Sequence, residues 1–170
     1  MADKNFKERL HTIKAFVFDI DGVLTDGRIF IMENENMVRA MNIRDSYALE
    51  HAIKSGYVIG IISGGKSETV RQCLLKLGIH DIYLNTRDKL DVLKEFMHIH
   101  NFNFDNILYM GDDLPDYEVL KKVGIPCCPK DAVTEIKEIS VYVSHKKGGH
   151  GCVRDVIEQT MKVQNKWTLK

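Results

Sequence analysis

The chain has 170 residues, of which 44% are hydrophobic and 28% charged, and its 24 acidic side chains balance its 24 basic ones. This length suits one buried core, so we expect a single domain over residues 1–170. The neutral balance offers no electrostatic basis for binding nucleic acid or an anionic membrane, and without an 18-residue apolar run or an apolar signal segment we expect a cytoplasmic protein.

The four cysteines, Cys73, Cys127, Cys128 and Cys152, show no Cys-x-x-Cys spacing. We expect them to be small buried side chains, and we do not expect disulfides or a zinc site. Free thiols of this kind are typical of a reducing compartment, in agreement with a cytoplasmic location.

The first strong pattern along the chain is an amphipathic helix over residues 3–13, followed by the apolar run 15–18. The run ends at Asp19, Asp21 and Gly22, as a buried strand would. Because strand side chains alternate between faces, the two carboxylates should emerge on one side and repel each other. This arrangement favours Mg2+, a hard cation that takes oxygen ligands.

A hairpin is expected over about 28–41, with strands at 28–32 and 37–41 around a polar turn. Such a hairpin is marginal alone in water, so it should rest on its own core or on another subunit.

Strands are then expected at 57–62, 82–84, 106–110, 125–128 and 141–143, and helices at 45–55, 66–77, 88–100, 114–123, 132–139 and 153–163. A basic Gly-rich loop at 146–151 precedes the last helix. The alternation predicts an α/β fold with a doubly wound, Rossmann-like parallel sheet.

Polar residues follow four of these strands or loops. They are Asp19 with Asp21, Ser63 with Gly64, Lys89, and the set Asp112, Asp113 and Asp116. Ligands of doubly wound sheets bind beyond the carboxyl ends of the strands. Carboxylates there can hold Mg2+, a hydroxyl and backbone amides can bind phosphoryl oxygens, and a lysine can offset the gathered negative charge. The pattern therefore predicts phosphoryl transfer.

Residues 16–116 resemble the haloacid dehalogenase (HAD) superfamily of phosphatases, in which these four motifs occur in this order. The resemblance implies that Asp19 is the nucleophile, that Asp21 is the acid and later the base, and that Lys89 stabilises the transition state. It also implies that Ser63 and the Gly64 amide bind the phosphoryl group. Magnesium would be held by Asp19, Asp112 and the backbone carbonyl of Asp21. Of Asp113 and Asp116, one would reach the metal and the other would fix Lys89, with their assignment left open.

Nearly the whole chain is similar to the capless phosphatases of 3-deoxy-D-manno-octulosonate 8-phosphate, a precursor of lipopolysaccharide. The segments that carry this likeness are 21–27, 42–47, 111–116 and 148–154. The resemblance implies a homotetramer with packed hairpins, in which the C-terminal segment of a neighbouring subunit, residues 146–154, closes the site. Contacts to the sugar acid are expected from Arg44, Lys66, Lys147, His150 and Arg154.

Three alternatives follow from the same residues. Many octulosonate phosphatases carry an arginine where this chain has Gly65, so the substrate could instead be a nine-carbon sialic-type sugar acid 9-phosphate. Residues 60–67 satisfy the Walker A spelling, but Ile61 and Ile62 continue the strand begun at Tyr57, so we reject a P-loop. A receiver-like signalling domain would carry its lysine late in the chain, whereas Lys89 precedes the motif at 111–113.

Overall fold

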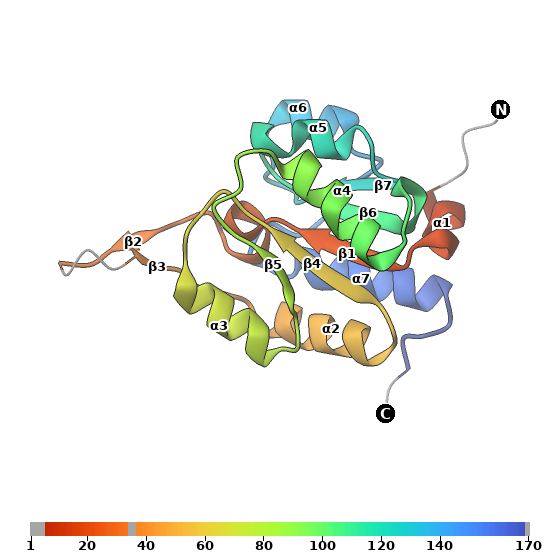
Figure 1. Cartoon of the computed structure of the whole chain (residues 1–170), viewed down its shortest axis with the longest axis horizontal. Helices are drawn as coiled ribbons and strands as arrows, with labels where there is room; N and C mark the ends of the chain where they lie inside the picture. Colours follow the sequence, from red (N-terminus) through yellow and green to blue (C-terminus); the bar gives the residue numbers. More distant parts are fainter. Residues whose placement is uncertain (1–5, 34–36, 169–170) are drawn as a thin grey trace.

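The computed structural model describes residues 6–33 and 37–168. Six parallel strands form one sheet in the order β5-β4-β1-β6-β7-β8 (Figure 1). The strands are β1 (Ala15–Phe18), β4 (Val58–Ile62), β5 (Asp81–Tyr83), β6 (Ile107–Met110), β7 (Ile125–Cys128) and β8 (Tyr142–Val143). The predicted doubly wound parallel sheet is confirmed.

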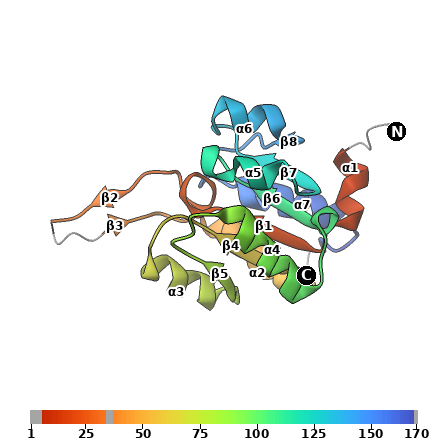
Figure 2. The same cartoon turned by 45° about the horizontal axis from the view of Figure 1, so that its top comes forward.

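Helices cover both faces of the sheet because its strands are apolar on both sides. One face carries α2 (Ile43–Lys54), α3 (Glu68–Lys76) and α7 (Cys152–Val163), and the other carries α4 (Lys89–His100), α5 (Tyr117–Leu120) and α6 (Thr134–Ile139) (Figures 1 and 2). Within β1, Phe16 and Phe18 belong to the first core, whereas Ala15 and Val17 belong to the second.

Most predicted elements are present with shifted ends. The expected helix at 3–13 is α1 (Phe6–Arg9) followed by a 3-10 turn, Leu10–Thr12, and residues 3–5 lie outside the described part. Helix α3 begins at Glu68 because the Ser67 side chain accepts a hydrogen bond from the Val70 amide. The helix expected at 114–123 opens as a 3-10 turn, Leu114–Asp116, before α5.

Two expectations about individual residues have clear outcomes. The expectation that all four cysteines are buried is wrong for Cys73, which is exposed because Val70 and Leu74 occupy the inner face of α3. The rejection of a P-loop is confirmed, because Gly60 lies inside β4 and pairs with Val17 of β1.

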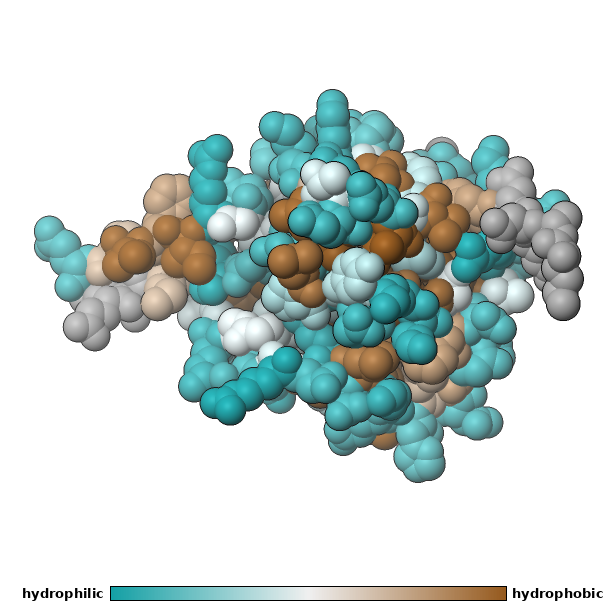
Figure 3. All heavy atoms as spheres, turned by 90° about the horizontal axis from the view of Figure 1, so that it is seen from above, coloured by the Kyte–Doolittle hydropathy of each residue, from teal (hydrophilic) through white to brown (hydrophobic). Residues whose placement is uncertain are grey.

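The hairpin consists of β2 (Phe30–Ile31) and β3 (Met37–Val38), which are antiparallel and shorter than predicted. Most of its predicted turn, 33–36, lies outside the described residues. The hairpin projects from the sheet (Figures 1 and 2), and Figure 3 shows apolar side chains gathered on it. Ile31 is 78% exposed and Phe30 57%. The hairpin therefore does not rest on a core of its own.

The strand order places a crevice beside the middle of the sheet. From β1 the chain moves to β4 and β5 on one side, and it later returns to β6 on the other side. Crevices at such a reversal lie beyond the carboxyl ends of the strands. Asp19 directly follows β1, Ser63 follows β4, and Asp112 comes two residues after β6. These residues therefore converge on one edge of the sheet.

The Gly-rich loop before α7 supports the segment that follows β1. The Gly149 amide donates to the carbonyl of Val23 at 2.9 Å. A Cβ on Gly148 would stand 1.9 Å from the carbonyl oxygen of Gly22. The buried Asp45 of α2 accepts hydrogen bonds from the amides of Gly151 and Arg154, at the start of α7. These contacts hold the loop on its own chain, against the backbone of Gly22 and Val23.

Gly148→Ala should therefore destabilise the protein. The added methyl group cannot avoid the Gly22 backbone, and overpacking of this kind costs about 2 kcal/mol. Thermal unfolding measures the loss, with Lys146→Ala as the control, because that side chain is exposed in the same loop. An unchanged melting temperature for Gly148→Ala would show that the two segments separate easily.

Candidate active site

A cavity of about 480 Å³ opens where the strands end. Its walls come from segments far apart in the sequence. They include Asp19, Asp21, Ser63, Gly64, Thr86, Arg87, Lys89, Asp112 and Asp113. The structure thus brings together predicted residues from all four motifs.

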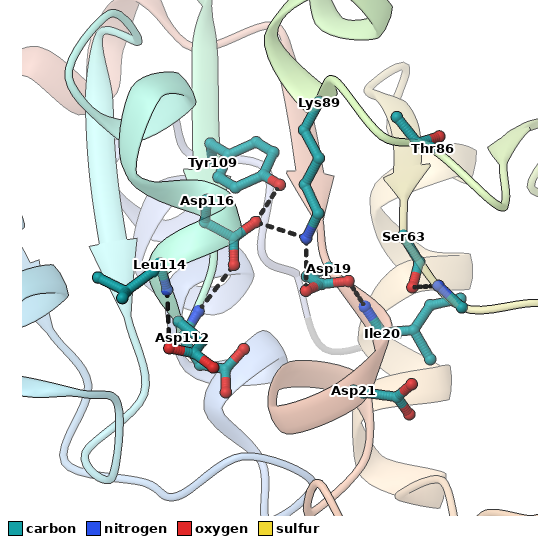
Figure 4. A network of polar contacts seen from close by, with 12 residues as sticks. Asp19, Ile20, Asp21, Ser63, Thr86, Lys89, Tyr109, Asp112, Leu114 and Asp116 are labelled. Atoms are coloured by element: carbon teal, nitrogen blue, oxygen red, sulfur yellow. Dashed lines mark hydrogen bonds and ion pairs between the residues drawn. The ribbon is translucent and has the colours of Figure 1, made fainter.

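A chain of short hydrogen bonds runs through the buried side of the cavity (Figure 4). The Lys89 ammonium donates to Asp19 Oδ2 at 2.6 Å and to Asp116 Oδ1 at 2.8 Å. The Tyr109 hydroxyl donates to the same Asp116 oxygen at 2.6 Å. Asp19 Oδ1 accepts from the Ile20 amide at 2.6 Å. Each buried charge in this hydrogen-bond network has an oppositely charged group or a hydrogen-bond donor beside it, as burial requires.

Burial also shifts the proton affinities of these groups. Desolvation, followed by the like charge of Asp116, raises the pKa of Asp19 to about 6. Desolvation and the charge of Asp19 raise the pKa of Asp112 to about 7. Burial by itself disfavours the Lys89 ammonium, but Asp116 and Asp19 outweigh it, so the pKa of Lys89 is raised. The site therefore concentrates negative charge that a cation would relieve.

Three carboxylates form a group that could hold this cation. Asp19, Asp112 and Asp116 each offer an oxygen, and these oxygens lie within 4.8 Å of one another. Gly22 makes room for the group, because a Cβ there would stand 2.0 Å from Asp112 Oδ2. The residue also has φ +86°, which disfavours other side chains. Carboxylate oxygens are the ligands that Mg2+ takes, so the donor set fits that ion.

Asp113 and Asp116, whose individual roles the sequence leaves open, lie in different environments. Asp116 joins the carboxylate group and binds Lys89, and its Oδ2 accepts from the Asp112 amide at 3.2 Å. Asp113 is exposed and accepts from the Leu114 amide at 2.8 Å, where it caps the 3-10 turn. Asp116 is thus the one of the pair that is built into the buried network.

Asp21 lies on the cavity wall, but its carboxylate points away from Asp19 (Figure 4). The sequence pairs the two carboxylates by strand alternation, whereas β1 ends at Phe18 and the chain enters a kinked π-type turn, Ile20–Leu24. The carboxylate that faces Asp19 across Lys89 is that of Asp116. Asp21 instead binds Arg39, whose Nε and Nη2 donate to its two oxygens at 2.7 and 3.1 Å.

The wall opposite the carboxylates presents a hydroxyl and backbone amides. Ser63 is buried, and its Oγ accepts from the Gly65 amide at 3.2 Å. Gly64 is exposed beside it and also lines the cavity. Such groups can bind phosphoryl oxygens.

The five residues expected to contact a sugar acid are placed elsewhere. Arg44, Lys66, Lys147 and His150 are exposed, and Arg154 pairs with Glu158 while its guanidinium lies over the rings of Tyr47 and Trp167. None of the five lines the cavity that holds Asp19. In the described part of a single subunit, these five side chains therefore do not reach the cavity. Their predicted contact with the sugar acid stays a prediction.

Comparisons with known proteins agree with this geometry. A profile described as haloacid dehalogenase-like hydrolase matches residues 75–155. The 3-deoxy-D-manno-octulosonate 8-phosphate phosphatase KdsC of Salmonella typhi is 33% identical over 158 residues, which cover 93% of this chain and 84% of that protein. The chain belongs to this family of HAD phosphatases. The KdsC of Escherichia coli K12, another member of the family, is 32% identical over the same share of both chains.

Solved structures of the phosphatase family have the same fold. A probable YrbI family phosphatase from Pseudomonas syringae superposes with a TM-score of 0.94 at 32% identity, covering 97% of this chain and 94% of that one. The octulosonate phosphatase of Moraxella catarrhalis, solved with magnesium, phosphate and KDO, gives 0.92 at 30% identity, covering 95% and 92%. The predicted family is therefore confirmed.

Reasoning from the sequence missed three residues of the site. Tyr109 lies in an apolar run that predicts only a strand, although its hydroxyl donates a hydrogen bond to Asp116. Arg87 lines the cavity just before the Asp88 cap of α4. Arg39 is a lone cation in the run Met37–Met41, and this isolation among apolar neighbours is the signal that could have marked it.

Proposed function

We propose that this chain is a Mg2+-dependent phosphomonoesterase that hydrolyses 3-deoxy-D-manno-octulosonate 8-phosphate in lipopolysaccharide precursor synthesis. We assign the activity to one HAD-type domain over residues 1–170. The observation that carries the proposal is Asp19, which is held by Lys89 at the floor of a cavity beside the carboxylates of Asp112 and Asp116. The family's members and their solved structures support the substrate.

In the first step, an oxygen of Asp19 attacks phosphorus and the bond from phosphorus to the sugar oxygen breaks. Asp21 gives its proton to that leaving oxygen, so the sugar departs as an alcohol. Lys89 stays between Asp19 and Asp116 and offsets the charge that develops. Ser63 Oγ and the Gly64 amide bind the phosphoryl oxygens.

In the second step, Asp21 takes a proton from water while the water oxygen attacks phosphorus. The bond between the Asp19 oxygen and phosphorus breaks, which frees inorganic phosphate and regenerates the carboxylate. Magnesium would be held by Asp19, Asp112 and the Asp21 carbonyl, with Asp116 beside them, and would neutralise charge on the phosphoryl oxygens. Phosphate and sugar thus leave a protein in its starting state.

A substrate panel tests the proposal. With magnesium present, kcat/KM should be highest for 3-deoxy-D-manno-octulosonate 8-phosphate and lower for a sialic-type sugar acid 9-phosphate and for 4-nitrophenyl phosphate. Gly65 departs from the arginine that many octulosonate phosphatases carry, so the nine-carbon acid is tested as the alternative substrate. A preference for the nine-carbon acid would replace the proposed substrate. A stable phosphoprotein without turnover would instead favour the receiver-like alternative.

Protons and magnesium should compete for the carboxylates. The pKa values of about 6 for Asp19 and about 7 for Asp112 mean that both groups take up protons as the pH falls from 8 to 5.5. We expect magnesium affinity, measured by calorimetry, to weaken over this range, with proton release on binding near pH 6.5. Equal affinity at pH 6 and pH 8 would contradict the assigned ligands.

The same shifts predict the stability of the metal-free protein. Both pKa values are raised above those of the unfolded chain, so between about pH 4 and pH 7 the folded state binds more protons. The contribution of these two groups to the free energy of unfolding therefore falls as the pH rises through this window. Added magnesium should restore stability most strongly above pH 7, which thermal unfolding can follow.

We further propose a homotetramer in which residues 146–154 of a neighbouring subunit cover the sugar acid. The exposed apolar side chains of the hairpin support an assembly, and the exposed cations Lys147 and His150 could face a carboxylate with their backbone still held on their own chain. Arg44, Lys66 and Arg154 would add to this charge. A cytoplasmic location, expected from the sequence, belongs to the same proposal.

Point substitutions test this closure better than truncation, because α7 buries Val153, Val156 and Ile157 in the core. Lys147→Ala with His150→Ala should raise KM for the sugar acid phosphate several-fold and leave KM for 4-nitrophenyl phosphate unchanged. Light scattering measures the assembly. A monomer with full activity on the sugar acid phosphate would exclude closure by a neighbour.

A further inference from the structure

Arg39 connects the hairpin to the cavity that contains Asp19. It follows β3, where Met37 and Val38 are exposed, yet its own side chain is only 5% exposed. Its Nε and Nη2 make two parallel hydrogen bonds to the two oxygens of Asp21. A guanidinium that binds a carboxylate in this way fixes both the position and the plane of the carboxylate.

Asp21 has little else to hold it. It lies in the kinked turn after β1, where its own φ and ψ are non-helical and Gly22 follows with φ +86°. Among the described residues, the Asp21 carboxylate accepts one further hydrogen bond, from Thr25 Oγ1 at a long 3.4 Å. Its side chain is 31% exposed on the cavity wall. Without Arg39, the carboxylate would be free to take other rotamers.

Gly65 supplies the surface against which this pair lies. A Cβ at Gly65 would stand 3.3 Å from Asp21 Oδ2 and 3.7 Å from Arg39 Nη2. A side chain at this position would require the Asp21 carboxylate to shift by a few tenths of an ångström. Gly65 thus lies close to both members of the Asp21–Arg39 pair.

We propose that Arg39 is a positioning residue, which holds Asp21 on the cavity wall for proton transfer to the leaving oxygen of the substrate. This inference rests on the acid–base role of Asp21 in the proposed function. Each carboxyl oxygen has two lone-pair sites, so two bonds from Arg39 leave room for the transferred proton. Arg39 itself exchanges no proton. Because Arg39 follows β3, the position of the hairpin and the orientation of Asp21 are coupled.

The test compares two leaving groups. A sugar alcohol needs a proton as it departs, whereas 4-nitrophenolate hardly does. Proton transfer by a positioned side chain contributes about 10²–10⁴-fold, so Arg39→Ala should lower kcat about 30-fold for the sugar acid phosphate and less than about threefold for 4-nitrophenyl phosphate. Arg39→Lys keeps the charge but loses the paired hydrogen bonds. It should change the ratio of kcat for the sugar acid phosphate to kcat for 4-nitrophenyl phosphate by a smaller factor than Arg39→Ala does.

A double-mutant cycle separates positioning from direct contact with the substrate. If Arg39 acts through Asp21, Arg39→Ala should have no further effect on kcat for the sugar acid phosphate in an Asp21→Asn background. Additive losses, or a rise in KM in both backgrounds, would overturn the proposal. If Arg39→Ala fails to fold, the cycle with Arg39→Lys decides by the same criterion.

Arg28→Ala is the matched control, because Arg28 lies at the base of the same hairpin, is 79% exposed and pairs only weakly with Asp26. The ratio of the two kcat values should not change in this variant. Wild-type protein that hydrolyses neither substrate would overturn the proposed function. Wild-type protein that hydrolyses both, with an unchanged ratio in the Arg39 variants, would overturn only the role of Arg39.

Discussion

Asp19→Asn should fold normally and lose phosphatase activity by a factor of at least about 10³, on both the sugar acid phosphate and 4-nitrophenyl phosphate. An amide cannot attack phosphorus, and an amide NH2 facing Lys89 would also lose the 2.6 Å bond from the ammonium. Because the nucleophile serves every substrate, the loss should not depend on the leaving group. This independence distinguishes Asp19 from Asp21 and Arg39.

Steady-state kinetics and thermal unfolding together check this result. Asp91→Asn is the control, since Asp91 is an exposed carboxylate on α4 whose partner is Lys94. A folded Asp19→Asn protein that keeps more than a few percent of the wild-type kcat would remove Asp19 as the nucleophile. A phosphorylated intermediate, trapped by rapid acid quench, should also be absent from this variant.

Lys89→Met should reduce both stability and activity. The Lys89 side chain is 4% exposed, and its ammonium lies between two buried carboxylates, Asp19 and Asp116. Removing one partner of a buried ion pair costs about 3 kcal/mol or more, because the remaining charges lose their compensation. Activity should fall by at least about 10²-fold, since charge on the transferred phosphoryl group is no longer offset.

The pH dependence of this stability loss has a definite sign. The pKa of Lys89 is raised, so the contribution of the ammonium is present throughout the neutral range in the wild-type protein. In Lys89→Met, the carboxylates can relieve their repulsion by binding a proton, so the variant should be least stable near pH 8 and recover towards pH 5.5. Magnesium should also recover part of the loss.

Lys94→Met provides the comparison for Lys89→Met. Both lysines lie on α4, but Lys94 is 55% exposed and pairs with the exposed Asp91. Exposed pairs contribute little, so the melting temperature of Lys94→Met should stay close to that of the wild-type protein at every pH. If both variants lose the same stability, the buried position of Lys89 has no special role.

Much of the fold followed from local patterns in the sequence. The apolar runs at β1 and β7 were predicted with their observed bounds, because a short run ended by Asp, Gly or Pro has few alternatives. The strand ends that carry Asp19, Ser63 and Asp112 were predicted for the same reason. Their convergence on one cavity follows from the parallel order of the sheet.

The sequence by itself determined the doubly wound sheet, the phosphatase family and the set of polar residues at the strand ends. Only the tertiary structure decided how these residues pair: Asp19 faces Asp116 across Lys89, and Asp21 turns to Arg39. It also decided that the Gly148 loop lies against Gly22 of its own chain. The physical reason is that the apolar period and the strand terminators are encoded within a few neighbouring residues. Side-chain partners, in contrast, depend on packing between segments that lie far apart along the chain.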